Sequence, residues 1–449
     1  MPSLINAIIS AQSALLAQQA NITVASHNLA NADSEGYSRQ SAVLAPLAGT
    51  SEGGNFYGLG VDVQTVTRSR DEFLDRSYRS ESGESSRAML LDDTWAQVNE
   101  AFGDPADGAL VSALANFWSS WQDLANDPES AATRVSVQTA GQSLAREFSR
   151  LSERLKQLCD NTTDTERTAA GEINRLARQI ADLNAHIVRE TSQNRAPNDL
   201  LDERDRLLDK LAEWGNISVE YKQNGSLLLH FGDSVLVEDD RVLPVRFDES
   251  SGTIRWQNAA REITITSGKA GGAQQFRNAA ADLLSRLDEI AVAIAREVNS
   301  IHRSGTGLDG SSGADFFAAN ITGAGDFGLD PAIAANAQRI AASGAQGAGD
   351  GLIARAIGQL NLQQLIGNRT IGEAFSDLIG IAGANGSTAT SDRTRAEAGL
   401  QQAANWRSSV SGVSVDEETV ALMKHQQAYA AAAKVYATVN AMMDALLLI

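Results

Sequence analysis

Two glycine-rich motifs are the first stretches whose residue types could support chemistry. GTGLDG at Gly305–Gly310 fits the GxGxxG pattern of nucleotide-binding loops, and GTSEG at Gly49–Gly53 fits the GxSxG pattern around a nucleophilic serine. A nucleotide cradle requires a strand before the loop and a helix after it, whereas a helix is predicted to precede Gly305. No strand-to-helix elbow is predicted around Ser51. Both motifs are therefore interpreted as loops.

Histidine, cysteine and carboxylate side chains offer no clearer site. The five histidines are scattered, without an HExxH motif or a Cys/His metal spacing: His27, His186, His230, His302 and His425. The single cysteine, Cys159, falls on a predicted helix and is interpreted as a buried, inert thiol. Carboxylates cluster within Asp199–Arg206, but two arginines interleave with them, so ion pairing is expected there. The sequence thus predicts no catalytic residue, no cofactor and no metal site.

Length and charge narrow the classes of protein that fit. A chain of 449 residues is expected to form two or three domains, and 43% apolar residues indicate a globular protein. The net charge of −19 argues against nucleic acid and anionic membranes as partners. No Lys or Arg precedes Arg39, so no basic region of a secretory signal is expected, and no run of about 20 apolar residues is present. These rules alone would assign the chain to the cytoplasm, although other export routes leave no such mark.

Two helices with heptad repeats are predicted at the two ends of the chain. In the C-terminal stretch the positions at seven-residue spacing are Val415, Leu422, Tyr429, Tyr436 and Met443, joined three residues further on by Ala432, Val439 and Leu446. In the N-terminal stretch they are Ile8, Leu15, Ile22 and Leu29. This spacing is typical of helices that pack on other helices.

The terminal helices can be interpreted in two ways. They either close an ordinary helical core within one chain, or they form a coiled-coil stalk between subunits. The apolar row continues to the last residues, Leu446–Ile449, which would be exposed unless something covers them. A single helix pair is expected to be marginal, because one row of side chains recovers little of the backbone entropy that is lost. We therefore favour the stalk.

The remainder of the chain predicts a mainly α fold with an inserted small β region. The first part is expected to contain a turn at 25–40 with Gly36 at positive φ, a glycine-rich loop at 49–60 and a strand at 60–68. Helices are expected to follow at 71–102, 109–126, 129–194 and 197–214, and then hairpin-rich β structure at 216–268. The last part is expected to contain a helix at 274–301, an irregular excursion or loosely packed subdomain at 304–351, and helices at 352–366 and 371–409. The polar stretch Asp160–Thr168 is expected to bend the long helix or shift its register. The charges of the helix after Pro197 suggest a solvated face.

The expected domains follow from this order. Residues 1–38 and 412–449 would form the terminal coiled-coil stalk, 39–214 and 270–411 a long-helix bundle with the excursion at about 304–351, and 215–269 the small β-rich region.

Four stretches, spread over the whole chain, resemble the FlgK family of flagellar axial proteins, the hook-associated proteins of the hook–filament junction. They are SHNLANADSEGYSRQ at 26–40, GVDVQTVTRSRDEFLDRSYR at 60–79, PNDLLDERDRLLDKL at 197–211 and SGVSVDEETVALMKHQQAYAAAAKVYATVNAMMDALL at 411–447. The terminal stretches are similar to flagellar axial proteins in general, and the internal one resembles a motif that hook and rod proteins lack. The motif residues carried by this resemblance are Asn28, Asn31, Gly36, Tyr37, Arg39, Gln40, Asn198, Asp199, Asp202, Arg204, Asp205, Gly412, Gln427 and Tyr429.

The resemblance implies a non-catalytic structural subunit of the bacterial flagellum. Such a subunit is exported unfolded through the flagellar type III system, without a cleaved signal, and so passes from the cytoplasm to the extracellular flagellum. It would form a ring of identical copies between the hook protein and the second junction protein, FlgL, with the chaperone FlgN on its C-terminal segment before export. The helices at its ends would pack between subunits. Another axial subunit of hook or rod type, or a wall hydrolase that serves flagellar assembly, remains an alternative.

Overall fold

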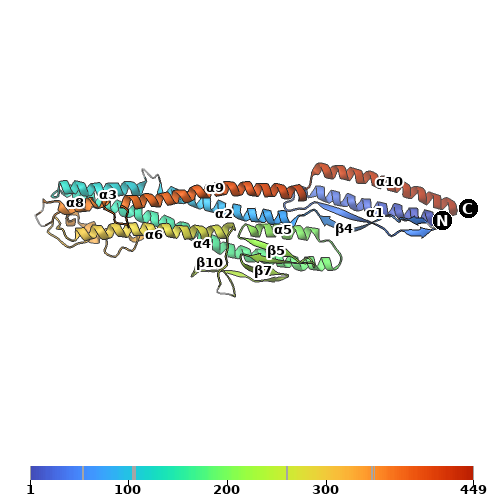
Figure 1. Ribbon diagram of the computed structural model, residues 1–449, viewed down its shortest axis with the longest axis horizontal. Helices are drawn as coiled ribbons and strands as arrows, with labels where there is room; N and C mark the ends of the chain where they lie inside the picture. Colours follow the sequence, from blue (N-terminus) through green and yellow to red (C-terminus); the bar gives the residue numbers. More distant parts are fainter. Residues whose placement is uncertain are drawn as a thin grey trace. The chain divides into compact units, whose positions relative to one another are not determined.

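The fold is described from a computed structural model, which covers residues 2–52, 55–103, 108–258, 261–344, 347 and 349–447. Within this range the chain is mainly helical with a few small antiparallel sheets, as predicted (Figure 1). It forms two compact units: unit 1 comprises Met1–Ser86, Thr168–Lys269 and Ala396–Ile449, and unit 2 comprises Arg87–Arg167 and Ala270–Arg395. The predicted helix stop at Asp104 and Pro105, Gly53 of the GxSxG motif, and the predicted apolar end at Leu448 and Ile449 lie outside the described residues.

The helices in chain order are α1 (Pro2–Ala30), α2 (Glu72–Phe102), α3 (Ala109–Asn126), α4 (Ala131–Ser192), α5 (Asn198–Ala212), α6 (Gly268–His302), α7 (Pro331–Ala335), α8 (Leu352–Gly358), α9 (Ile371–Ser411) and α10 (Val415–Leu447). The strands are β1 (Gln40–Pro46), β2 (Thr50–Glu52), β3 (Asn55–Tyr57), β4 (Val61–Arg68), β5 (Ile217–Tyr221), β6 (Leu227–Phe231), β7 (Ser234–Glu238), β8 (Arg241–Val242), β9 (Val245–Asp248) and β10 (Thr253–Trp256).

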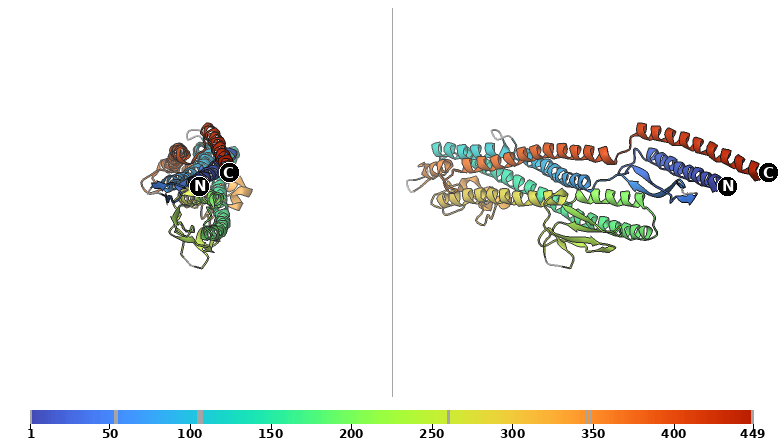
Figure 2. Two further views of the ribbon diagram at one scale, coloured as in Figure 1. Left: turned by 90° about the vertical axis from the view of Figure 1, so that its right-hand side faces the viewer. Right: turned by 45° about the vertical axis from the view of Figure 1, so that its right-hand side comes forward.

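In unit 1 the two terminal helices lie side by side. Helix α1 packs along α10 and also contacts β1 and β4 (Figures 1 and 2). Strands β1 and β4 pair antiparallel from Gln40↔Arg68 to Pro46↔Val61, with an irregularity at Val43/Leu44. The loop predicted at 49–60 is wrong in part, because β2 and β3 pair there as a short hairpin.

Gly60 shows why the chain can pass so close to α1 before β4. Its φ is 103°, a region that side-chain-bearing residues rarely adopt, and a Cβ at this position would lie 1.9 Å from Ser13 Oγ. The same hydroxyl accepts a hydrogen bond from the Val61 amide at 3.1 Å. The glycine therefore lets a polar contact fix the start of β4 on α1.

The predicted β region is confirmed as a set of antiparallel hairpins in unit 1. Strands β5, β6, β7 and β8 form one sheet in sequential order, and β9 pairs with β10 separately. Gly225, Gly232 and Gly252 have positive φ at turns that the sequence predicts from Asn-Gly, Gly-Asp and Ser-Gly pairs.

Unit 2 is built around aromatic side chains. Helix α3 has the predicted bounds, and its Phe117 and Trp121 are buried against Phe316 and Phe317 of the excursion between α6 and α8. The excursion is irregular, as expected, with the short turns η1 (Ala324–Asp326) and η2 (Ala337–Arg339) around α7. The alternative of a loosely packed subdomain is wrong, because Phe316 and Phe317 are fully buried.

Some predicted helix bounds need correction. Helix α6 begins six residues before the predicted Gln274. The helix predicted at 352–366 is shorter, because α8 ends at Gly358 and only the turn η3 (Leu360–Leu362) follows.

The polar stretch of α4 shifts the register of its buried face without ending the helix. Buried positions proceed from Leu158 to Thr162, Glu166 and Ala169, in steps of four, four and three residues. A regular heptad row would alternate threes and fours, so an extra residue is absorbed here. In unit 2, Glu166 Oε2 accepts a hydrogen bond from Arg277 Nη1 at 2.9 Å, which compensates its burial.

Candidate functional site: a polar network joining the terminal helices to helix α5

Asn28 on α1 binds two other motif residues of the N-terminal part, Tyr37 and Gln40. Its Nδ2 donates to Gln40 O at 2.9 Å and to Glu418 Oε2 at 3.1 Å. Its Oδ1 accepts from Gln40 N at 2.9 Å and from the Tyr37 hydroxyl at 2.8 Å. The amide is thus fully used inside the protein. One side chain of α1 therefore fixes both the returning chain after the turn and the first turn of α10.

Arg39 makes the second connection to the C-terminal helices. Its Nε donates to Glu418 Oε1 at 2.8 Å, and Nη1 donates to Glu417 Oε2 at 3.1 Å. Its backbone amide donates to Ser411 O, the end of α9, at 2.9 Å. The carboxylates lie in the first turn of α10, where negative charge opposes the helix dipole. They also bind the N-terminal motif, which the sequence does not predict.

Helix α5 presents its carboxylates to this N-terminal segment. Asp202 accepts from Ser38 N at 3.0 Å, from Ser38 Oγ at 2.6 Å and from Arg68 Nη1 at 2.6 Å. Gln40 Nε2 donates to Asp199 Oδ1 at 3.1 Å, and Asn198 Nδ2 donates to Val66 O at 2.9 Å. The solvated face predicted for α5 is confirmed in part, because Asp199 and Lys210 are exposed and Glu203 and Arg206 are half-buried. The charges on the other side of the helix, Asp202, Arg204 and Asp205, are buried.

Five buried or nearly buried arginine–aspartate pairs continue the network. Asp205 accepts from Arg68 at 3.0 Å and from Arg79 at 3.1 Å, and Asp209 accepts from Arg79 at 2.8 Å and from Arg407 at 2.6 Å. Arg70 binds Asp75 through two nitrogens, at 2.9 and 3.0 Å. Carboxylates and guanidinium groups balance in this cluster, which is the condition under which buried charges are tolerated.

The pKa of Asp205 reflects the balance between its burial and the neighbouring arginines. Burial would raise its pKa, but Arg70, Arg79, Arg68 and Arg204 outweigh burial and lower the pKa from 3.8 to about 2. The carboxylate therefore stays ionised over the whole physiological pH range.

Arg204 differs from the other arginines of the network. Its Nη1 donates to Asn184 Oδ1 at 3.0 Å and to Gly225 O at 2.7 Å, while its Nε has no hydrogen-bond partner. Its guanidinium carbon lies 5.6 Å from the centre of the Tyr221 ring. Burial lowers the pKa of Arg204. This side chain joins α4 and α5 to the β5–β6 turn.

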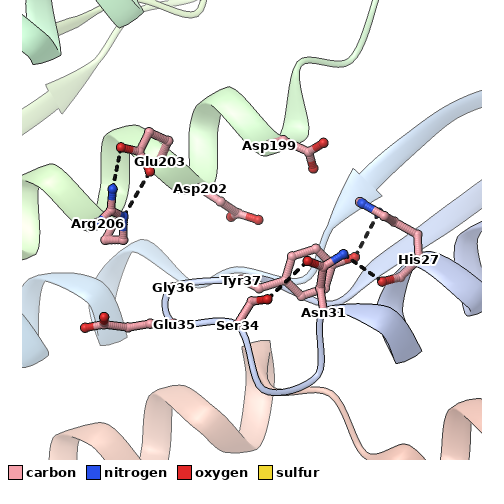
Figure 3. Close-up of a pocket in the computed structure, with 10 residues that line it drawn as sticks. All are labelled: His27, Asn31, Ser34, Glu35, Gly36, Tyr37, Asp199, Asp202, Glu203 and Arg206. Carbon is pink, nitrogen blue, oxygen red and sulfur yellow. Dashed lines mark hydrogen bonds and ion pairs between the residues drawn. The ribbon is translucent and has the colours of Figure 1, made fainter.

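A cavity of about 290 Å³ opens beside the network (Figure 3). Its lining residues are His27, Asn31, Ser34, Glu35, Gly36, Tyr37, Asp199, Asp202, Glu203 and Arg206. Gly36 has the predicted positive φ, at 80°, and the Asn31 Nδ2 donates to His27 O at 3.0 Å. Burial, followed by Asp199, Asp202 and Glu418, raises the pKa of Tyr37, so its hydroxyl remains a neutral donor.

The chemistry of these groups is that of a structural joint. The Tyr37, Ser38 and Asp202 oxygens are all engaged in the hydrogen bonds above. Among the described residues, no group of three or more His, Cys, Asp or Glu side chains is arranged to hold a metal ion. Within the same residues, no helix is both long and apolar enough to cross a membrane.

Sequence reasoning missed several residues that complete the network. These are Ser38, Arg68, Arg70, Arg79, Arg407 and Glu418. The available signal was the spacing of Asp199, Asp202, Asp205 and Asp209, which places four carboxylates along one stretch of α5. Such a row requires positive partners from elsewhere, and 60–79 supplies three of the arginines.

The predicted stalk residues occupy two kinds of position. Those that are buried or half-buried between α1 and α10 are Ile8, Leu15, Ile22, Leu29, Leu422, Val439 and Met443. Those that are exposed are Val415, Tyr429, Tyr436 and Leu446. Gln427 is exposed, and Gly412 is half-buried where its amide donates to Ser408 O at 2.8 Å. Their packing against other subunits stays a prediction.

Three models of known protein families match stretches of this chain. A model of the FlgK helical domain of flagellar hook-associated proteins matches residues 95–317. A model of the flagellar basal body rod protein matches 8–37, and one of the C-terminal region of the rod FlgEFG proteins matches 407–448. The chain belongs to the FlgK family of flagellar hook-associated proteins. It is accordingly an axial component of the bacterial flagellum.

Curated FlgK-family proteins are similar over the whole chain. Flagellar hook-associated protein 1 of Bacillus subtilis is 28% identical, over 99% of this chain and 98% of its own length. The protein of the same name from Salmonella typhimurium is 25% identical over 100% of both chains. The FlgK structure from Burkholderia pseudomallei, a flagellar hook junction protein, has the same fold, with a TM-score of 0.68 at 16% identity, covering 75% of this chain and 100% of that one.

Residues of the polar network lie in each of the three matched regions. Asn28 and Tyr37 lie in the first matched region, Asp202 and Asp205 in the second, and Glu418 in the third. The internal motif at 197–211 falls within the FlgK helical domain, whereas the end regions resemble rod proteins as well. The network is where the shared terminal regions meet the part specific to FlgK.

Proposed function

We propose that this chain is a structural subunit that forms the junction between hook and filament. In this proposal it is exported unfolded by the flagellar type III system and polymerises through α1 and α10. Its neighbours are other copies in a ring, the hook protein on one side and FlgL on the other, and FlgN holds the C-terminal segment before export. The names of the relatives above and the match to the FlgK helical domain support this proposal.

The observation that carries the proposal is the apolar surface of the terminal helices. Helices α1 and α10 pack on each other, and α1 also contacts β1 and β4. The large apolar side chains left exposed on them are Ile5, Ile9, Leu16, Val415, Val420, Met423, Tyr429, Val435, Tyr436, Met442 and Leu446. Apolar surface of this extent on one helix pair is unusual for a monomer and typical of a surface that a protein partner covers.

The polar network then has a defined role in the proposal. It would hold the pair α1–α10 on α5 in one position, so that the contacts between neighbouring copies repeat. On this basis we assign three regions: a stalk of 1–38 and 412–449, a bundle of 39–214 and 270–411, and a β-rich region of 215–269. The two compact units divide the chain differently, and they do not test that assignment.

Substitution of Val435 by Glu tests assembly through the exposed face. The side chain of Val435 is 52% exposed, so Val435→Glu should leave the purified protein's circular dichroism and melting temperature unchanged. Burying the new carboxylate between subunits is costly, so the variant should not restore motility to a strain that lacks the gene. We expect it in the culture medium instead of on the flagellum. Gln426→Glu, at an exposed polar position nine residues earlier and so on the opposite side of the same helix, is the matched control and should restore motility.

Normal motility of the Val435→Glu strain would contradict assembly through this face. Retention of the variant inside the cell would instead point to a defect in export.

A further inference from the structure

His302, at the end of α6 in unit 2, is fully buried between two backbone groups of the excursion. Its Nδ1 lies 2.7 Å from Ala314 O, and its Nε2 lies 2.8 Å from Ala341 N. A carbonyl oxygen only accepts and an amide N–H only donates, so Nδ1 must carry the proton and Nε2 must offer its lone pair. The arrangement therefore requires a neutral imidazole in a single tautomer.

Asn299, one turn earlier on the same face of α6, holds the adjoining backbone. Its Oδ1 accepts from Phe316 N at 2.9 Å and from Phe317 N at 2.8 Å, and its Nδ2 donates to Phe317 O at 2.9 Å. Asn299 does not titrate, so this contact is independent of pH. His302 binds both the beginning of the excursion, at Ala314, and its later part, at Ala341. Thr306 N, which donates to Ser343 O at 2.9 Å, and Arg134, which donates to Ile340 O, also hold the later part, and neither contact depends on the protonation of His302.

Protonation would remove the contact to the later part. A proton on Nε2 would point at the Ala341 N–H, so two donors would face each other. The resulting cation would lie beside the rings of Trp121 and Phe316, with centroid distances of 6.2 and 5.7 Å. Burial of a charge in such surroundings is costly.

The charged groups around the imidazole do not compensate this cost. They are Arg303 directly after α6, Arg134 on α4, and Asp315 and Asp330 in the excursion. Asp315 is already paired with Arg303. Burial therefore lowers the pKa of His302 below its usual 6.5, although the Ala314 carbonyl and Asp315 act in the opposite direction.

We propose that His302 is an acid-sensitive fastener, which helps to hold the segment around Ala341 on the end of α6 while neutral and loosens it when protonated. In the loosened state the imidazole regains its ordinary pKa. The equilibrium constant for loosening then rises by up to about tenfold for each pH unit below about 6.5. The stability that the fastener provides is present above this pH and is lost as pH falls through the lower pKa of the folded state.

Amide hydrogen exchange of the full chain between pH 8 and 5, corrected for the intrinsic exchange rate, tests the fastener. Protection in peptides that cover 338–344 should fall by up to about tenfold per pH unit below about 6.5. Protection in 283–295 of α6 should remain constant. Flat protection around Ala341, or an equal loss in α6, would overturn the proposal.

His302→Gln is the variant that removes titration, because an amide can both donate and accept but does not gain a proton in this range. Its protection around Ala341 should be lower than in the wild type at pH 8 and independent of pH. His186→Gln, at an exposed histidine, should keep the wild-type slope. A wild-type slope in His302→Gln would overturn the proposal. If His302→Gln fails to fold, the imidazole ¹⁵N chemical shifts of the wild type decide: an Nδ1–H tautomer supports the fastener, and an Nε2–H tautomer overturns it.

Discussion

At the scale of single residues, the charges of α5 are the feature that most needs explanation. Asp202, Arg204 and Asp205 are each less than a tenth exposed, on a helix whose sequence looks like a solvated surface. Ion pairs at i, i+3 spacing account only for Glu203 and Arg206, at 2.5 Å. Asp202 and Asp205 pair with Arg68 and Arg79, more than 100 positions away in sequence, so no local rule could predict these pairs.

Removal of the Asp205 charge should therefore lower the free energy of unfolding strongly. Asp205→Asn leaves Arg68 and Arg79 buried with less negative charge, and we expect a loss of about 3–5 kcal/mol in the free energy of unfolding of unit 1 at pH 7. Glu203→Gln, which breaks an exposed pair on the same helix, should cost less than about 1 kcal/mol. Urea denaturation gives the free energy of unfolding of both variants. Equal losses would show that the buried ion pairs of Asp205 stabilise the protein no more than the exposed Glu203–Arg206 pair.

The pH dependence of the same variant follows from the lowered pKa of Asp205. Its folded-state pKa of about 2 lies below the ordinary 3.8, so its stabilising contribution is present above about pH 4 and is lost as pH falls towards 2. The difference in unfolding free energy between the wild type and Asp205→Asn should shrink over that interval.

At the scale of elements, helices with strong local signals could be predicted and weakly patterned segments could not. Helix α3 has the predicted bounds, because its aromatic residues recur at helical spacing and Pro128 follows it. Strand β1 was missed because its burial does not alternate and its partner, β4, lies about 20 residues later. The turn at Gly36 was predicted correctly, but nothing local indicates that Tyr37 and Ser38 contact α1 and α5.

The joint between α10 and the N-terminal motif can be tested at Glu418. Its carboxylate accepts from both Asn28 and Arg39, and its side chain is 4% exposed, compared with 64% for Glu417. Glu418→Gln should weaken a charge-assisted contact by about 1.5–3 kcal/mol, seen as faster hydrogen exchange in the first turns of α10 and at residues 37–40. Glu417→Gln should have little effect, and similar exchange in the two variants would contradict the assigned role of Glu418.

At the scale of the whole molecule, the family and the fold class can be predicted from the sequence, whereas the bounds of the compact units cannot. The family follows from motifs spread along the chain, and the fold class follows from long periodic helices with one β insertion. The bounds of the two compact units have no local sequence signal, because they fall inside α2, α4, α6 and α9, where the helix continues. The polar network lies within unit 1 and assembles residues from both ends of the chain and its middle.

The measurement that most directly tests assembly through the terminal helices is amide hydrogen exchange of the purified monomer. Because α1 and α10 leave many large apolar side chains exposed, amides at 2–27 and 420–447 should exchange at least about 100-fold faster than those of α5, with protection rising towards Asn28 and Glu418. Protection of the terminal helices equal to that of α5 would contradict this, because the ends would then already close a stable core without neighbouring subunits.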